Sequence, residues 1–258
     1  MEHSEQVAPV ALITGGAVRV GRAITTTLAR AGYRVWLHYH SSEAAAAEVA
    51  GELGAACLGT IRGDLAAESA RAEVAQRVRD VAGPAGGRLD LLVNSAASFE
   101  RGRFLERADD DLRRVLEVNL VAPVSLARAL APALTAARGA VVNILDVAAL
   151  QPWPGYLDHC TAKAGLLMAT RALAVELAPA VRVNGVAPGT VAWPEEDPRY
   201  AEGSEIRARI LRAIPLGRIG TPEDVAETVL FLARSAFVSG QVIAVDGGRT
   251  AAGGVAGG

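Results

Sequence analysis

The sequence predicts a single α/β domain built on a doubly wound, parallel sheet. Short apolar runs alternate with amphipathic segments along all 258 residues, which is the pattern of repeated strand–helix units. A glycine-rich turn follows the first apolar run, and no linker or change of composition divides the chain. These observations favour a single domain that spans residues 1–258, rather than two smaller domains.

The composition argues against several classes of function. Hydrophobic residues make up 51% of the chain and charged residues 21%, and the net charge is −2. Because no basic block is present, we expect neither nucleic acid nor a membrane as a partner. No apolar run approaches the roughly 20 residues that span a bilayer, and the two cysteines, Cys57 and Cys160, lack metal-ligand spacing. We therefore expect a cytoplasmic protein, without a metal, that acts on a small molecule.

The first predicted strand, residues 10–15, runs into a turn that contains Gly15, Gly16 and Gly21 and then into an amphipathic helix. Glycines let the backbone approach a pyrophosphate, and the amide groups of the helix N-terminus attract its charge. This unit predicts a dinucleotide-binding site, although an ordinary tight strand–helix connection would have the same pattern.

The second predicted strand, residues 34–40, ends at His40 and continues into Ser41 and Ser42. An acidic residue at this point would select NAD by accepting the ribose hydroxyls, and none is present. The three donors suit a 2′-phosphate, so we expect NADP or NADPH. His38 shares a face with His40 by strand alternation, but the sequence offers no third ligand for a metal.

The remaining elements alternate to the end of the chain. We expect helices over residues 43–56, 66–82, 109–138, 156–178 and 221–233, with Pro123 kinking the third of them. The residues at the carboxyl ends of the strands should converge on the glycine turn, among them Asp146, Phe99, Pro188 and Gly189. Residues 190–217 accumulate Pro, Gly and charge, which predicts a substrate lid, and residues 250–258 should form a flexible tail.

Several motifs together resemble those of the short-chain dehydrogenase/reductase family: TGGAVRVG, the Asp64-Leu65 pair, NSAAS, Asn119, the helix with Lys163, VNGVAPG and VDGG. Arg22 replaces the last glycine of the family's first turn. The resemblance implies a Rossmann-type domain, a nicotinamide cofactor and a homotetramer. It also implies a cofactor site made of Gly15, Arg19, Val20, Gly21, His40, Ser41, Ser42, Asp64, Leu65, Ser95, Ala96, Lys163, Pro188 and Gly189. Asp64 would serve equally well as the N-cap of the next helix.

Within that family, further details are similar to pteridine reductases, including LHYH in the second strand and an Asp rather than a Ser at Asp146. This likeness implies reduction of a pterin or dihydrofolate-type ring by NADPH. Phe99 would stack the ring, Arg19 would contact the pyrophosphate and the pterin, and Tyr156 would line the substrate pocket. Ala97 stands where those enzymes have a serine, so one polar contact is lost. Phe99 could instead be a loop anchor, and Arg19 a solvated arginine.

The resemblance implies a proton-donating Tyr at the position of His159, with Lys163 one helical turn later and Asp146 thirteen residues earlier as the orienting group. Three interpretations stay open. His159 donates the proton, directly or through a water; Tyr156, one turn earlier, reaches in; or proton transfer is impaired. In the last case the protein is a narrow-scope reductase of dihydropterins or dihydrofolate, or merely binds NADP. A reductase of another carbonyl or imine substrate is a further alternative. Imidazole titrates near pH 6.5 and phenol near pH 10, so the first two would differ in pH dependence.

Overall fold

The computed structural model describes residues 8–80, 87–194 and 197–253, and in them one parallel sheet has the order β3-β2-β1-β4-β5-β6-β7. The order reverses between β1 and β4, which confirms the predicted doubly wound α/β domain. The strands are β1 (Val10–Thr14), β2 (Arg34–Tyr39), β3 (Cys57–Arg62), β4 (Leu91–Asn94), β5 (Ala140–Ile144), β6 (Arg182–Pro188) and β7 (Val242–Val245).

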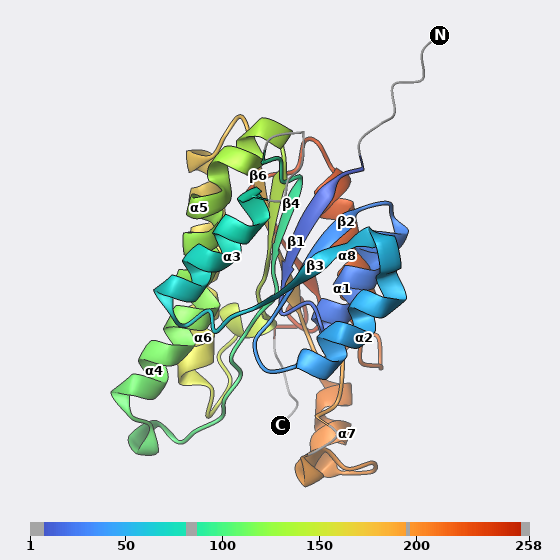
Figure 1. The fold of residues 1–258 in the computed structure, drawn as a ribbon. Helices are drawn as coiled ribbons and strands as arrows, with labels where there is room; N and C mark the ends of the chain where they lie inside the picture. Colours follow the sequence, from blue (N-terminus) through green and yellow to red (C-terminus); the bar gives the residue numbers. More distant parts are fainter. Residues whose placement is uncertain (1–7, 81–86, 195–196, 254–258) are drawn as a thin grey trace.

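Helices cover both faces of the sheet (Figure 1). One layer contains α1 (Arg19–Arg30), α2 (Glu43–Leu53) and α8 (Pro222–Arg234), and the other contains α3 (Glu68–Asp80), α5 (Ala122–Ala137) and α6 (Leu157–Glu176). The orange helix α7 (Glu205–Arg212) lies beyond the lower end of the sheet in Figure 1. Two further helices are α4 (Asp109–Leu116) and the π-helical turn η4 (Glu117–Val121); the short 3₁₀ turns are η1 (Gly54–Ala56), η3 (Phe104–Glu106), η5 (Val147–Ala149) and η6 (Pro198–Tyr200).

The apolar strands are buried from both sides, as their continuous hydrophobic runs predict. Leu12 and Leu92 belong to the cluster under α3 and α5, whereas Ile13 and Val93 belong to the cluster under α1 and α8. Successive side chains of a strand point to opposite faces, so each central strand contributes to both cores. The sheet is therefore a rigid frame whose carboxyl edge carries the loops of the site.

The helix predicted over residues 109–138 is interrupted. The N–H of Ala122 donates to the carbonyl of Glu117, five residues earlier, which closes the π-helical turn η4 around Asn119. Pro123 follows this turn, and because proline has no N–H it cannot continue the regular α-helical ladder. The predicted kink therefore takes the form of one wide turn.

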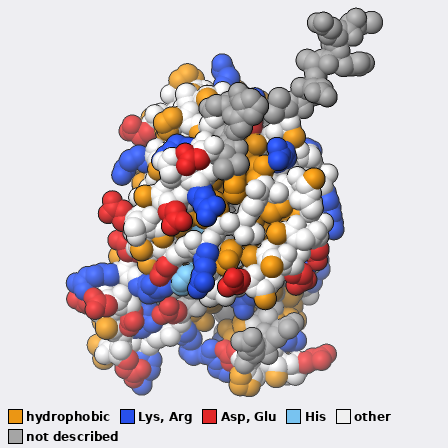
Figure 2. Space-filling view, viewed as in Figure 1, with side chains coloured by type: hydrophobic (Ala, Val, Ile, Leu, Met, Phe, Trp, Pro, Cys, Tyr) orange, Lys and Arg blue, Asp and Glu red, His pale blue; other side chains and the backbone are white. Residues whose placement is uncertain are grey.

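Among the described residues, the continuous segment Asp109–Ala137 is long and apolar enough to cross a membrane, with a mean hydropathy of 1.5. The expectation that no such segment exists was therefore wrong. Core helices pass the same test, and Leu126, Leu130 and Leu134 of this segment are fully buried against the sheet. Figure 2 shows acidic and basic side chains intermingled over the face that it presents, with no field of a single sign.

Candidate active site

The glycine turn after β1 is held by close backbone contacts. Gly15 has φ +63°, and a Cβ on it would lie 2.9 Å from the Cα of Ala96; a Cβ on Gly21 would lie 2.0 Å from the carbonyl oxygen of Gly15. No larger side chain fits at either position. The hydroxyl of Thr14 accepts the N–H groups of Ser95 and Ala96 at 3.0 and 3.1 Å. The turns after β1 and β4 are thereby fixed together at the point where the strand order reverses.

The N-terminus of α1 presents Arg19 with φ +49°, a conformation that is uncommon outside glycine and concentrates at functional sites. Arg19 lines a cavity that also contains Asp146 in its wall. Arg22 forms ion pairs with Glu48 and Glu52 of α2 at 2.8 and 2.7 Å. The side chain of the arginine that replaces the family's last glycine therefore joins α1 to α2.

His38 is buried under the glycine turn, where it is bonded to backbone on both sides. Its Nδ1 accepts the N–H of Gly15 at 3.3 Å, and its Nε2 donates to the carbonyl of Gly63 at 3.0 Å. Burial lowers the pKa of His38 to about 4, so the ring is neutral at physiological pH. Both ring nitrogens are used, which leaves none for the metal site that strand alternation raised as a possibility.

The predicted adenosine side of the cofactor site lies after β2 and β3. His40 is exposed, and its Nε2 lies 4.0 Å from the carboxylate of Asp64. Asp64 accepts the N–H of Ala66 at 3.1 Å and two bonds from Arg114 at 3.1 Å each. It therefore caps the turn before α3, the alternative role that the sequence left open. Of its neighbours in the prediction, Ser41 is exposed, Ser42 is half-buried and Leu65 is buried.

The end of β5 and the first turns of α6 bring the three predicted catalytic residues together. His159 Nε2 lies 3.4 Å from Asp146 Oδ2, and Lys163 Nζ donates to the carbonyl of Ile144 at 2.7 Å. Burial lowers the pKa of Lys163 to about 8, while the charge of Asp146 opposes that shift. His159 and Lys163 are each only 3% exposed, whereas Asp146 lines the cavity. The cavity therefore meets this group through Asp146.

Asn119 determines which nitrogen of His159 carries hydrogen. Its Oδ1 accepts the N–H of Ser98 and its Nδ2 donates to the carbonyl of Ser98, both at 2.8 Å, so the amide orientation is fixed. The same Nδ2 lies 3.4 Å from His159 Nδ1. A donor facing Nδ1 requires a lone pair there, which puts the hydrogen of neutral His159 on Nε2, toward Asp146.

Aromatic rings separate His159 from the open cavity. Phe99 stacks on Tyr156 with ring centroids 4.7 Å apart and meets the ring of His159 edge-on at 4.8 Å. Tyr156 is the N-cap of α6 and not part of its first turn, and its ring belongs to the cavity wall. Burial raises the pKa of Tyr156, which Arg199 and Arg101 partly oppose. Ala97 is exposed and is not among the residues that line this cavity, so its place beside a substrate stays a prediction.

The cavity has a volume of about 510 Å³, within the range of small-molecule sites. Predicted residues in its wall are Arg19, Val20, Phe99, Asp146, Tyr156 and Gly189. The predicted lid contributes to the same wall, and it contains η6 and α7 where the sequence suggested a loop. Residues 195–196 of this segment and 254–258 of the predicted tail lie outside the described residues. That the segment opens and closes stays a prediction.

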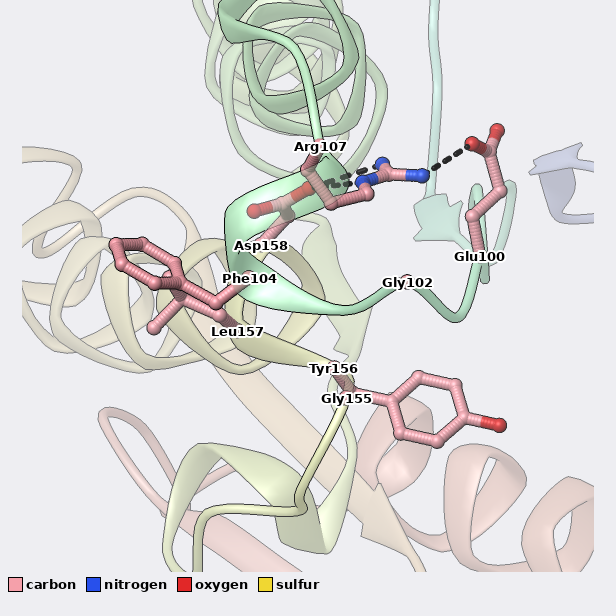
Figure 3. Close-up of a pocket in the computed structure, with 8 residues that line it drawn as sticks. All are labelled: Glu100, Gly102, Phe104, Arg107, Gly155, Tyr156, Leu157 and Asp158. Carbon is pink, nitrogen blue, oxygen red and sulfur yellow. Dashed lines mark hydrogen bonds and ion pairs between the residues drawn. The ribbon is translucent and has the colours of Figure 1, made fainter.

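A second hollow, of about 10 Å³, lies at the start of α6 (Figure 3). Arg107 donates through Nε to Asp158 at 2.9 Å and through Nη1 to Glu100 at 3.2 Å. In Figure 3, Tyr156 points away from this ion cluster. The hollow has room for roughly one water, so it is not a substrate site. Its ion pairs tie the loop after β4 to the residue that precedes His159.

Comparison with known proteins identifies the family. Residues 16–250 match the family model described as enoyl-(acyl carrier protein) reductase. The chain is 36% identical over 246 residues to a 3-oxoacyl-(acyl-carrier-protein) reductase of Aquifex aeolicus, covering 93% of this chain and 96% of the relative. The protein is a short-chain dehydrogenase/reductase.

Other relatives of this short-chain dehydrogenase/reductase agree. A 3-oxoacyl-(acyl-carrier-protein) reductase of Synechocystis is 34% identical, with 93% of this chain and 96% of the relative covered. Carbonyl reductase family member 4 of Danio rerio is 32% identical, with 93% and 97% covered. The family resemblance is confirmed. The likeness to pteridine reductases and the equivalence of His159 to the family tyrosine stay predictions.

The sequence interpretation missed much of the substrate side of this short-chain dehydrogenase/reductase. The unpredicted residues of the cavity wall include Arg101, Trp153, Trp193, Arg199, Arg209 and Arg249. The positions of the tryptophans in the sequence could have indicated part of this wall. Two of the chain's three tryptophans lie outside strands and helices, where a large aromatic side chain has no regular core position to fill.

Proposed function

We propose that this short-chain dehydrogenase/reductase reduces a C=N or C=O bond with NADPH, and that a pterin or dihydrofolate-type ring is the first substrate to test. The observation that carries the proposal is the grouping of Asp146, His159 and Lys163 at the carboxyl edge of the sheet. Asp146 shares a cavity with the N-terminal residues of α1, where a dinucleotide pyrophosphate would bind.

The residues around the glycine turn fit such a cofactor. Helix α1 has no acidic residue in its first turn, so its amide groups and Arg19 offer an uncompensated anion site. Ser95 and Ala96 follow β4, Pro188 ends β6 and Gly189 follows it, all at the same edge of the sheet. Lys163, whose Nζ donates to the carbonyl of Ile144, would have to exchange that bond to hold the nicotinamide ribose. When bound, the cofactor would supply the hydride. His40, Ser41 and Ser42 would favour the phosphorylated form, NADPH.

We assign proton delivery to His159. To act as the acid, His159 would first take up a proton from solvent to become imidazolium. It would then give the Nε2 proton, which faces Asp146, to a substrate heteroatom or a water at the edge of Asp146 and return to the neutral ring, against which Phe99 packs. Tyr156 is the alternative donor, because it belongs to the cavity wall. Burial raises its pKa, however, which makes it a weaker acid at neutral pH.

The wall of the cavity suggests the shape of the substrate. Phe99 and Tyr156 stack on one another and Trp153 meets Phe99 edge-on at 6.5 Å, a surface that suits a flat conjugated ring. A 3-oxoacyl thioester is the second candidate, because two of the relatives are named 3-oxoacyl-(acyl-carrier-protein) reductases. An NADP-binding protein with an impaired catalytic centre is the third.

One assay separates these candidates: NADPH consumption with biopterin, dihydrobiopterin, dihydrofolate and acetoacetyl-CoA from pH 5 to 9. We expect turnover of the dihydro compounds. We also expect kcat/KM, which reports the free enzyme, to fall above pH 8 as Lys163 loses its proton. The Lys163→Arg variant, permanently charged, should lack that limb. Turnover of acetoacetyl-CoA alone would select the thioester; cofactor binding without consumption of any compound would select the impaired centre.

We also propose that the protein forms a homotetramer in the cytoplasm. Met168 and Val175 of α6 are 60% and 77% exposed, so this helix carries apolar surface that an assembly would cover. Cys57 and Cys160 are free thiols, which suits a reducing compartment. Light scattering should give four times the chain mass, and a monomeric mass at micromolar concentration would refute the assembly.

A further inference from the structure

The described part of the cavity wall carries strongly unbalanced charge. Five arginines line the cavity and Asp146 is the one acidic residue among its described lining, although the whole chain carries a net charge of −2. Arg19, at the N-terminus of α1, belongs to the cofactor side. Four guanidinium groups are left for the substrate side, far more positive charge than a neutral ligand needs.

Four separate segments supply these groups, which are Arg101, Arg199, Arg209 and Arg249. Arg101 follows β4 and packs against Gly155, where a Cβ would lie 3.2 Å from its Nε. Arg199 and Arg209 come from η6 and α7, beyond the end of the sheet (Figure 1). Arg249 follows β7 and lies 5.3 Å from the ring centroid of Trp153. Because the four arginines come from four separate segments, their grouping at the cavity is produced by the tertiary fold and not by their spacing along one helix.

The four arginines on the substrate side differ in whether they form ion pairs with carboxylates. Arg199 is bonded to Asp197, with Nε 3.0 Å from Oδ2. Within residues 8–80, 87–194 and 197–253, no carboxylate lies within ion-pair distance of Arg101, Arg209 or Arg249. On the same helix as Arg209, Arg212 is paired with Glu205 at 2.6 Å. Helix α7 therefore turns an ion-paired arginine to solvent and a different one to the cavity.

We propose, resting on the reductase function above, that the substrate carries two or more carboxylate or phosphate groups at the end away from the reacting bond. Arg101, Arg209 and Arg249 bind these groups, while the aromatic wall holds the reacting part near Asp146. Planar guanidinium groups match the geometry of both anions in bidentate bonds. Two sources share this chemistry: the carboxylates of a folate-type tail and the phosphates of a coenzyme A thioester.

Matched substrate pairs test the proposal. Dihydrofolate carries two carboxylates that dihydrobiopterin lacks, and acetoacetyl-CoA carries phosphates that acetoacetyl-N-acetylcysteamine lacks. For whichever pair is reduced, we expect the anionic member to have a kcat/KM about tenfold or more above the neutral one, mainly through KM, as charge-assisted bonds imply. Arg209→Gln should remove most of that ratio, and Arg212→Gln, on the same helix, should keep it. Raising the salt concentration should shrink the ratio.

The outcomes are distinguishable from failure of the reductase function. Equal kcat/KM for both members of the reduced pair, or a ratio that Arg209→Gln does not change, would overturn the anionic substrate while leaving the reductase intact. If no compound is reduced, the reductase fails, and quenching of Trp153 and Trp193 fluorescence still tests binding. Folate that binds at least tenfold more tightly than biopterin would support the arginine site; equal affinities would overturn it.

Discussion

His38 and His159 are both buried, at 1% and 3% exposure, but the structure surrounds them differently. His38 bonds to backbone groups at 3.0 and 3.3 Å, under the glycine turn. His159 faces two side chains, Asp146 and Asn119, at 3.4 Å each. Loss or gain of a proton at His38 would break a hydrogen bond to the backbone of Gly15 or Gly63. At His159 it would change only contacts with the side chains of Asp146 and Asn119, which can move. His38 therefore supports the fold, whereas His159 can take part in proton transfer.

Removing the second imidazole tests the contrast most strongly. We expect His159→Ala to lower kcat on the best substrate by about 100- to 10,000-fold, the usual contribution of a general acid. Its unfolding free energy should fall as well, because alanine leaves a cavity beside Phe99 at a buried position, so the rate is measured where the variant is still folded. Rates of NADPH oxidation and urea unfolding measure the two quantities. A variant that keeps the wild-type rate would move proton delivery to Tyr156 or to water.

Acid titration tests the first imidazole. The pKa of His38 is about 4 when folded and near 6.5 when unfolded, so the unfolded chain binds more protons between these values. The stability contributed by neutral His38 is complete above pH 6.5 and is lost as pH falls toward 4, by about 3 kcal/mol from 1.36 kcal/mol per unit.

Urea unfolding at pH 4 to 7 would measure this loss in matched variants. His38→Gln keeps a donor and an acceptor but does not titrate, so its stability should fall less steeply than that of the wild type. His40→Gln should retain the wild-type slope. Equal slopes for the wild type and His38→Gln would mean that the buried ring is not held neutral.

The smallest effect belongs to the third histidine of this region. His40 is exposed, and we expect His40→Ala to change the unfolding free energy by less than about 0.5 kcal/mol. Its effect should appear instead in cofactor choice, as a severalfold loss of preference for NADPH over NADH. Unchanged Kd values for both cofactors would remove His40 from the 2′-phosphate site.

The frame of this protein could be predicted from the sequence because its signals are local. Apolar runs give the strands, and the glycine spacing gives the turn after β1. The pattern of residues 221–233 gives a helix, which the structure contains as α8 with a capping box formed by Thr221 and Asp224. The resemblance to the family implied that Asp146, His159 and Lys163 lie together. The spacing alone fixes only His159 and Lys163, which are one helical turn apart.

The substrate side could not be predicted in the same way. Arg101, Arg209 and Arg249 meet only through tertiary contacts between distant segments, and no spacing in the sequence relates them. The edge-on contact of Phe99 with His159 depends on the path of a loop. The anchoring of Gly15 by His38 likewise depends on β2 lying beside β1 in the sheet.

The π-helical turn at Asn119 makes the site sensitive to chain length. This turn contains one residue more than an α-helical turn. Loss of any single residue between Glu117 and Val121 would restore a regular helix and rotate the preceding segment by about 100°. Asn119 or its substitute would then face away from His159. Homologous chains can replace residues in this turn one by one, but an alignment gap there would mark a protein with a different proton route.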